Sequence, residues 1–344
     1  MKKIVSRILL LCLFLQLFSL CACNAKPEFE YEVVAGHAII TGYNGDGGDI
    51  LIPSDLGGYS VYGVGYGVFR GNLTITSVYL SEGIQKLGRE AFFQCNEMKS
   101  IHIPSTLVFE DDYFGFTSKK LEKITVADNH PLYKVAGNCL LDKSNVLLRG
   151  CLTSVIPDYV TEIGDGAFER LDITSFVIPE HIQTIGTSLF YFCEELTSVT
   201  LPKHLTAIPA GMFGGCTKLE TVTLPDGVTL IGDGAFAYCD MLKSVTLPDG
   251  VTRLGERAFF NCPTLLSINF PDGLEFIGPN AFRACNNLTH LEIPSGVTEI
   301  GEEAFAWCDR LAVIRCGAEK QPSTWNENWA YCCSAKIVWN YTNQ

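Results

Sequence analysis

Histidine, the residue type that most often carries protons in enzymes near neutral pH, is scarce in this sequence. The 344 residues include 6 histidines, and these are scattered along the chain. The motifs His-Glu-x-x-His, Gly-x-Ser-x-Gly and the phosphate-binding P-loop are absent. Cys-x-x-Cys pairs and His pairs at metal-ligand spacing are absent too. We therefore predict no catalytic residues, no metal and no cofactor, and expect that the protein is not an enzyme.

Charged side chains are also few, and cationic ones are the fewest. Asp and Glu number 38 against 25 Lys and Arg, which gives a formal net charge of −13 at pH 7. An acidic protein repels the phosphates of nucleic acids, so we expect no nucleic-acid partner. Partners with basic surface patches are favoured instead. Only 18% of the residues are charged and 47% are hydrophobic, which fits a chain with a large interior.

Long apolar runs are missing, apart from a short one near the N-terminus. Lys2, Lys3 and Arg7 precede a mostly apolar stretch over 8–20, which is too short to cross a bilayer comfortably. A positive start followed by a short apolar run is typical of a secretory signal. We predict a signal peptide of the lipoprotein type over residues 1–22.

The end of that segment, Leu-Cys-Ala-Cys at 20–23, resembles a bacterial lipobox. In such a signal Cys23 is the lipid attachment site, and its acyl chains hold the protein at the membrane. Residues 23–27 would then form a short tether. Cys21 departs from the usual lipobox pattern, so an ordinary cleaved signal without lipid is the alternative.

The most abundant pattern in the sequence is a repeating unit of constant length, marked by prolines that recur at equal spacing along the chain. Phenylalanines and cysteines recur with the same step. A fixed period in the range of about 20–50 residues indicates a solenoid, in which each repeat forms one turn. The recurring residues are Pro179, Pro202, Pro225, Pro248, Pro271 and Pro294; Phe190, Phe213, Phe236, Phe259, Phe282 and Phe305; and Cys193, Cys216, Cys239, Cys262, Cys285 and Cys308.

A single repeat shows what each turn can build. Val245 and Leu247 alternate with polar neighbours, the pattern of a half-buried strand. Pro-Asp-Gly at 248–250 predicts a turn, since Pro fixes φ and Gly accepts a positive φ. The apolar residues over 251–262 are mostly three to four apart, which favours a short extended piece followed by one tight helical turn. One repeat cannot bury these residues alone, so we expect neighbouring strands to stack into a parallel sheet.

The Leu-x-x-Val-x-Leu-Pro strand and the Val-Thr-x-Ile-Gly-x-x-Ala-Phe-x-x-Cys segment resemble the BspA-type leucine-rich repeat, a class of bacterial surface proteins. The resemblance covers residues 28–340. It implies a leucine-rich repeat solenoid with a parallel β-sheet on the concave face and short extended or helical turns on the convex side. It also implies a role in adhesion to host proteins or to other cells, because these are the family's known binding roles.

The segments around and between the repeats depart from the pattern. Alternating apolar residues near the N-terminus predict a β cap, which a solenoid needs to cover its first turn. Apolar runs at 132–142 and 146–148 predict two short strands, a hairpin inserted between turns. In the repeat before this hairpin, Phe114 and Phe116 are expected to replace the Ala-Phe pair. The predicted organisation is a β cap at 28–56, repeats at 57–126, the inserted hairpin at 127–156, repeats at 157–316 and a C-terminal cap at 317–344.

Tryptophan is concentrated in the C-terminal cap. Three of the 4 tryptophans of the chain, Trp325, Trp329 and Trp339, lie there. Such aromatic residues can close an apolar turn and still keep an N–H group near water. A tryptophan-lined groove for a sugar is the alternative.

Seven cysteines, namely Cys95 and the six in register, share one column of the repeat. In leucine-rich repeats this column takes Asn or Cys, which can hydrogen-bond the neighbouring backbone. Turns stacked about 4.8 Å apart hold the side chains of a column parallel, whereas a disulfide needs Cβ atoms roughly 3.5–4.5 Å apart in a suitable orientation. We predict buried, free thiols. The state of five others stays open, with a bridge from Cys316 to Cys332 or Cys333 as one possibility; these five are Cys139, Cys151, Cys316, Cys332 and Cys333.

Two side chains of each strand would point out of the concave face. In the middle repeats most of them are Ser or Thr, while larger side chains stand near both ends. If the face binds a ligand, these larger groups would give specificity. The candidate binding residues are Tyr79, His102, His290, Glu292 and Arg315.

Export, a rigid repeat array and the lack of catalytic motifs together favour a binding role. We predict a monomeric, lipid-anchored surface module or adhesin of a bacterium, whose partner is a protein on a host or neighbouring cell. The alternative is a structural protein of the cell envelope without a specific ligand. Saturable binding would distinguish the two.

Overall fold

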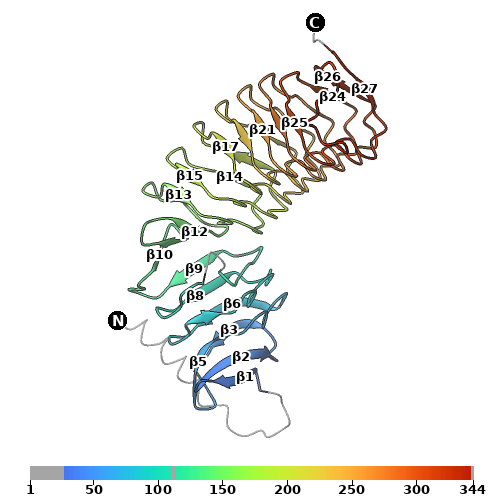
Figure 1. Cartoon of the computed structure of the whole chain (residues 1–344). Helices are drawn as coiled ribbons and strands as arrows, with labels where there is room; N and C mark the ends of the chain where they lie inside the picture. The colour runs from blue at the N-terminus through green and yellow to red at the C-terminus, as the bar shows by residue number, and fades with distance from the viewer. Residues whose placement is uncertain (1–26, 111–113, 342–344) are drawn as a thin grey trace.

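The structure is a computed structural model that describes residues 27–110 and 114–341. These residues form a parallel β-solenoid that curves along its length, with the N- and C-terminal turns at opposite ends (Figure 1). The predicted solenoid and its parallel sheet are confirmed. The described ranges contain no helix that is long and apolar enough to cross a membrane. The predicted signal segment and Cys23 lie outside the described residues.

The first side of each turn carries the outward Ser and Thr columns, and we call it the strand face. In the middle of the solenoid, Ser244 pairs with Thr221 on one side and with Ser267 on the other, the equivalent residues of the two neighbouring repeats. The pairing register of the strands therefore follows the period of the sequence repeat. The strands of this face are β3 (Gly48–Ile52), β6 (Ile75–Leu80), β8 (Ser100–Ile103), β9 (Lys123–Val126), β14 (Ser175–Val177), β16 (Ser198–Thr200), β18 (Thr221–Val222), β20 (Ser244–Val245), β22 (Ser267–Ile268), β24 (His290–Ile293), β26 (Val313–Cys316) and β27 (Lys336–Val338).

The second side is a ladder of two-residue strands at the Ile-Gly position of the repeat. A glycine follows each strand except β17, which is followed by Pro209, and it lies against the backbone of the neighbouring turn; a Cβ on Gly232, for example, would come within 2.6 Å of the Ala210 nitrogen. These strands are β13 (Glu162–Ile163), β15 (Thr184–Ile185), β17 (Ala207–Ile208), β19 (Leu230–Ile231), β21 (Arg253–Leu254), β23 (Phe276–Ile277) and β25 (Glu299–Ile300).

The third side contains the Ala-Phe pair, and we call it the turn face. The expected helical turn is absent, and no helix of any kind occurs among the described residues. The reason is a left-handed residue at two positions of each repeat, such as Arg257 with φ 55° and Asn261 with φ 53°. A right-handed helix needs φ near −60°, so these positions interrupt it. The backbone instead bonds to the next turn, as from Phe236 N to Ala258 O at 2.8 Å.

The interior consists of stacked columns. Phe236 and Phe259 lie face to face, with ring centroids 5.1 Å apart and an angle of 6° between the planes. The seven column cysteines are free and buried, as predicted. Each thiol donates to the carbonyl of a phenylalanine in the preceding turn at 3.0 to 3.2 Å. Burial raises the pKa of Cys193 to about 12, so it stays protonated.

The two ladders begin earlier than the sequence pattern indicates. Residues 28–56 contain the antiparallel ribbon of β1 (Phe29–Val34) and β2 (His37–Tyr43), but β2 also pairs in parallel with β5 (Tyr59–Val64). Likewise β3 pairs in parallel with β6. Residues 28–56 therefore form both the N-terminal cap and the first turn of the solenoid. The short strands β4 (Asp55–Leu56) and β7 (Lys86–Leu87) both pair with β5.

The inserted segment contains three antiparallel strands, where the sequence pattern predicted two. They are β10 (Tyr133–Ala136), β11 (Cys139–Asp142) and β12 (Leu147–Arg149). The last of them then pairs in parallel with β13 and so starts the second part of the Ile-Gly ladder. We call this junction between the two runs of repeats the seam.

One aromatic assignment near the seam needs correction. The sequence pattern placed Phe114 and Phe116 at the positions of the Ala-Phe pair. The backbone bond from Phe92 N to Gly115 O, at 2.7 Å, instead places Gly115 and Phe116 in those positions. Phe116 is buried in the column, while Phe114 lies outside it at the seam.

The tryptophans of the last segment pack inward. Trp329 meets Phe305 edge to face at 5.8 Å, and the Trp325 indole N–H donates to Val297 O at 3.2 Å. Because Trp325 and Trp329 are buried, they do not form an open groove for a sugar, and that alternative is wrong for them. Cys316, Cys332 and Cys333 are all free, so none of them forms the bridge considered above.

Candidate binding face

The N-terminal end of the strand face carries a ring stack. Tyr79 in β6 and His102 in β8 are register partners, and their rings lie 4.3 Å apart and nearly parallel. Half of Tyr79 is exposed, at 50%. The His102 Nδ1 atom lies 3.0 Å from the Thr125 hydroxyl. Burial lowers the pKa of His102, so the ring is neutral at pH 7 and presents an apolar and hydrogen-bonding surface.

Leu51 continues this row of exposed side chains, and sequence reasoning missed it. It is the register partner of Tyr79 in β3, and 54% of it is exposed. The signal was present, because Asp49-Ile-Leu-Ile-Pro53 has the alternation of the repeat strand. It was hidden because the step from Leu51 to Tyr79 is longer than the regular step from Tyr79 to His102.

The C-terminal end of the face carries charged groups. Arg315 in β26 and Glu292 in β24 are register partners, and an Arg315 guanidinium nitrogen lies 3.2 Å from a Glu292 carboxylate oxygen. The guanidinium also lies over the Tyr341 ring, 5.2 Å from its centroid. Both side chains are partly exposed, so the pair can bind a partner without large desolvation.

A hollow of about 420 Å³ lies beside this pair. Within it, the Asn269 side chain accepts from the Leu247 N–H and donates to the Leu247 carbonyl, each at 3.2 Å. Hydroxyls, an imidazole and a carboxylate make it polar. Its lining is Ser244, Val245, Thr246, Ser267, Ile268, Asn269, Phe270, His290 and Glu292.

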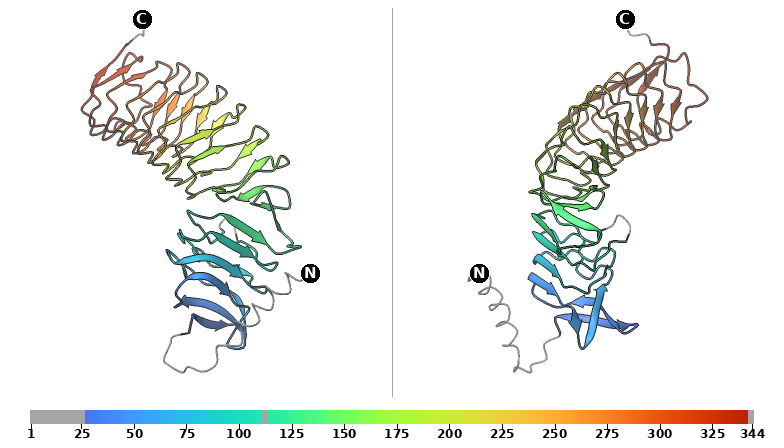
Figure 2. Two further views of the ribbon diagram at one scale, coloured as in Figure 1. Left: turned by 180° about the vertical axis from the view of Figure 1, so that it is seen from behind. Right: turned by 90° about the vertical axis from the view of Figure 1, so that its left-hand side faces the viewer.

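The five candidate residues therefore form two groups. Tyr79 meets His102, Glu292 meets Arg315, and His290 lines the same hollow as Glu292. The strands that carry these groups stand near opposite ends of the solenoid, as the labels β6 and β24 show in Figure 1 and the residue-number colours show in Figure 2. One small ligand does not reach both, but an extended protein surface would.

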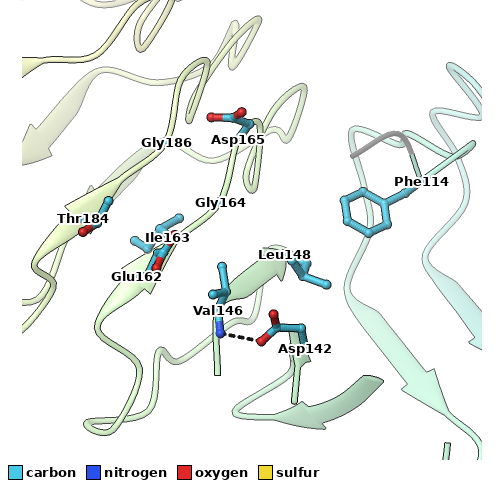
Figure 3. A pocket seen from close by; sticks show the side chains of 10 residues that line it. All are labelled: Phe114, Asp142, Val146, Leu148, Glu162, Ile163, Gly164, Asp165, Thr184 and Gly186. Atoms are coloured by element: carbon cyan, nitrogen blue, oxygen red, sulfur yellow. Dashed lines mark hydrogen bonds between the residues drawn. The ribbon is translucent and has the colours of Figure 1, made fainter. Parts of the chain in front are cut away.

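A further pocket, of about 330 Å³, opens at the seam (Figure 3). Phe114 stands on one side of it, and Asp142, Val146 and Leu148 on the other. Its two aspartates serve the fold, since Asp142 accepts from Val146 N at 2.8 Å and Asp165 from the Thr187 hydroxyl at 2.9 Å. Across the described part of the chain, no group of three or more His, Cys, Asp or Glu is arranged to hold a metal ion.

Comparison with protein families assigns this repeat. The model of the BspA type leucine rich repeat region matches in 6 copies, over residues 59–146, 150–265 and 230–337. The chain belongs to the BspA-type leucine-rich repeat family. No curated protein matches it significantly.

Solved structures resemble this BspA-type chain at low identity. The leucine rich cell surface protein from Faecalibacterium prausnitzii A2-165 is 24% identical, with 94% of this chain and 96% of that one covered and a TM-score of 0.42. A leucine-rich repeat protein from Bacteroides ovatus ATCC 8483 is 20% identical, with 92% and 99% covered and a TM-score of 0.38. The pneumococcal vaccine antigen PcpA is 18% identical, with 94% and 85% covered, and its TM-score of 0.51 shows a shared fold.

Proposed function

We propose that this BspA-type protein is exported, anchored through lipid on Cys23, and acts at the bacterial surface as a protein-binding module or adhesin. One observation carries the proposal: the strand face, mostly Ser and Thr in its middle, carries a ring stack at one end and an ion pair with a hollow at the other. Tyrosine and arginine are the residues that most often dominate protein interfaces.

The charge of the molecule supports a basic protein partner. With a formal net charge of −13, the surface attracts cationic patches and slows encounters with acidic ones. On the strand face Glu292 is paired with Arg315 and the Tyr79–His102 stack is neutral, so the attraction for a basic partner comes from the net charge of the molecule, while these side chains supply the direct contacts. Binding of this kind should weaken as salt is added.

Binding is tested with the full-length protein on a panel of immobilised extracellular-matrix proteins. We expect saturable binding to at least one of them, and a Kd raised at least tenfold by Tyr79→Ala and by Arg315→Ala, about 1.4 kcal/mol each. The matched controls are Tyr66→Ala, an exposed tyrosine on the turn face, and Arg310→Ala, an exposed arginine outside the strand face. They should leave Kd unchanged.

Two outcomes would contradict binding through the strand face. Equal losses in the controls would place the binding surface elsewhere. Absence of saturable binding to any matrix protein or to bacterial cells would favour a structural envelope protein.

Lipid attachment is tested separately. A labelled fatty acid should enter the wild-type protein in a bacterial host and should not enter Cys23→Ser, because the thiol is the acceptor in a lipobox. Label retained in the variant would show that Cys23 is not the anchor.

A further inference from the structure

The turn face carries a groove that the repeat pattern does not require. The position after the Phe of the Ala-Phe pair is Tyr191, Gly214, Ala237 and Phe260 in four successive turns. Two small residues thus lie between two aromatic ones. A cavity of about 790 Å³ occupies this place, and we call it the turn-face groove.

Small residues and aromatic rings line the groove. Its floor includes Ala210, Gly211 and Gly234, and Tyr238 adds a third aromatic ring, which meets Phe260 edge to face at 5.3 Å. The three steps of the phenylalanine column beneath it measure 6.0, 5.3 and 5.1 Å. The Tyr191 ring lies over Gly214, 3.0 Å from where a Cβ of that residue would stand, so the groove opens between this ring and the Tyr238–Phe260 pair. The volume lies within the usual range of small-molecule sites.

Polar groups surround these walls, and some of them have hydrogen-bonding capacity that the fold does not use. No hydrogen bond within the described residues engages the hydroxyls of Ser188 or Tyr238. Asp233 uses one carboxylate oxygen to accept from Glu256 N at 2.7 Å, which leaves the other oxygen available. The Arg257 guanidinium lies 3.5 Å from the Glu256 carboxylate, and these two side chains are 58% and 50% exposed. The rim thus offers donors and acceptors together.

We propose that the turn-face groove binds a neutral oligosaccharide. A sugar ring has an apolar C–H face, which packs on the electron-rich face of an aromatic ring, and an edge of hydroxyls, which both donate and accept. Asp233 and Glu256 against Arg257 leave the rim slightly negative, which disfavours anionic sugars. The described residues that line the cavity include no Leu, Ile, Val or Met, the aliphatic side chains on which an apolar peptide side chain would pack.

The repeat itself supplies variants that preserve the fold. Ala237→Phe places in the groove the residue that the next turn carries at the same position, Phe260. Tyr238→Asn removes an aromatic wall and installs the residue of the next turn, Asn261, which has the same left-handed backbone, with φ 53° against 60°. Both variants should melt as cooperatively as the wild type.

The test is titration of the full-length protein with maltotetraose, cellotetraose, laminaritetraose, mannotetraose and chitotetraose, by calorimetry and by saturation-transfer NMR. We expect at least one to bind, with affinity reduced tenfold or more by Ala237→Phe and by Tyr238→Asn. The exposed Tyr66→Ala control should not change it. Tyr79→Ala should not change it either, which separates this site from the strand face.

Two results would overturn the proposal. One is no binding of any of the five saccharides at millimolar concentration. The other is saccharide binding that both groove variants leave intact. If the groove variants instead weaken binding to a protein partner and no saccharide binds, the groove is a protein contact.

Discussion

At the scale of the residue, position within the repeat decides how much a side chain contributes. Phe236 is fully buried, with Phe213 and Phe259 stacked on its two faces at 5.3 and 5.1 Å. Thr223 is exposed on the strand face. Burial of an aromatic ring removes far more apolar surface from water than a threonine methyl does on the outside.

Phe236→Ala should therefore lower the free energy of unfolding by about 3–5 kcal/mol, the usual range for a buried phenylalanine. Thr223→Ala should lower it by well under half of that. Urea denaturation of both variants gives the comparison. Similar losses would mean that the inward and outward columns have been assigned wrongly.

At the scale of the element, the seam is held by a buried charge. Arg149 in β12 donates to Gly166 O at 2.8 Å and to Glu169 O at 3.0 Å. Its guanidinium also lies 3.4 Å from the Glu169 carboxylate, while its Nε atom has no partner. These bonds tie the inserted strands to the turn that follows them, where side-chain contacts supplement the single backbone pairing of β12 and β13.

Arg149→Met keeps the length and apolar stem of the side chain but removes its donors. We expect the free energy of unfolding to fall by about 1–3 kcal/mol, because the partly buried carbonyls of Gly166 and Glu169 lose a charged donor. Arg310→Met, at an exposed arginine, should change it by no more than about 0.5 kcal/mol. Chemical denaturation measures both, and no difference between them would show that Arg149 does not hold the seam.

At the scale of the whole molecule, the cysteine column makes the solenoid sensitive to alkali. Burial raises the pKa of every thiol in the column, to about 12 for Cys95 and Cys193. In the unfolded chain the thiols lose their protons near pH 8.5. Above that pH the unfolded state binds fewer protons than the folded state, so stability falls as pH rises.

We expect each column thiol to lower the free energy of unfolding by about 1.4 kcal/mol for each pH unit above about pH 9. The triple variant with Asn at Cys216, Cys239 and Cys262 should lose stability less steeply between pH 8.5 and 10, since Asn does not titrate. Cys332→Ser, at an exposed thiol, should keep the wild-type slope. Urea midpoints across this pH range give the slopes, and equal slopes in all three proteins would contradict the buried-thiol column.

The sequence by itself determined the features that depend on repeat positions whose neighbours are the same from one turn to the next. Every regular turn places its Phe, Cys and Pro against the same neighbours, so a fixed step along the chain is enough to predict the solenoid, its register and the free thiols. It also predicted which residues of the strand face are neighbours. Tyr79 and His102 stack because they are one period apart.

Only the tertiary structure decided what happens where turns differ. The position of Phe114, the third strand of the seam and the start of the ladder at β3 depend on how unequal turns align, and a period does not contain that information. The missing helix follows from left-handed residues at positions that carry Arg, Asn, Tyr or Trp as readily as Gly. Likewise, the hollow beside His290 and the turn-face groove arise from side chains of several adjacent turns. Their shape comes from size differences across the stack, which become visible only when the turns are packed together.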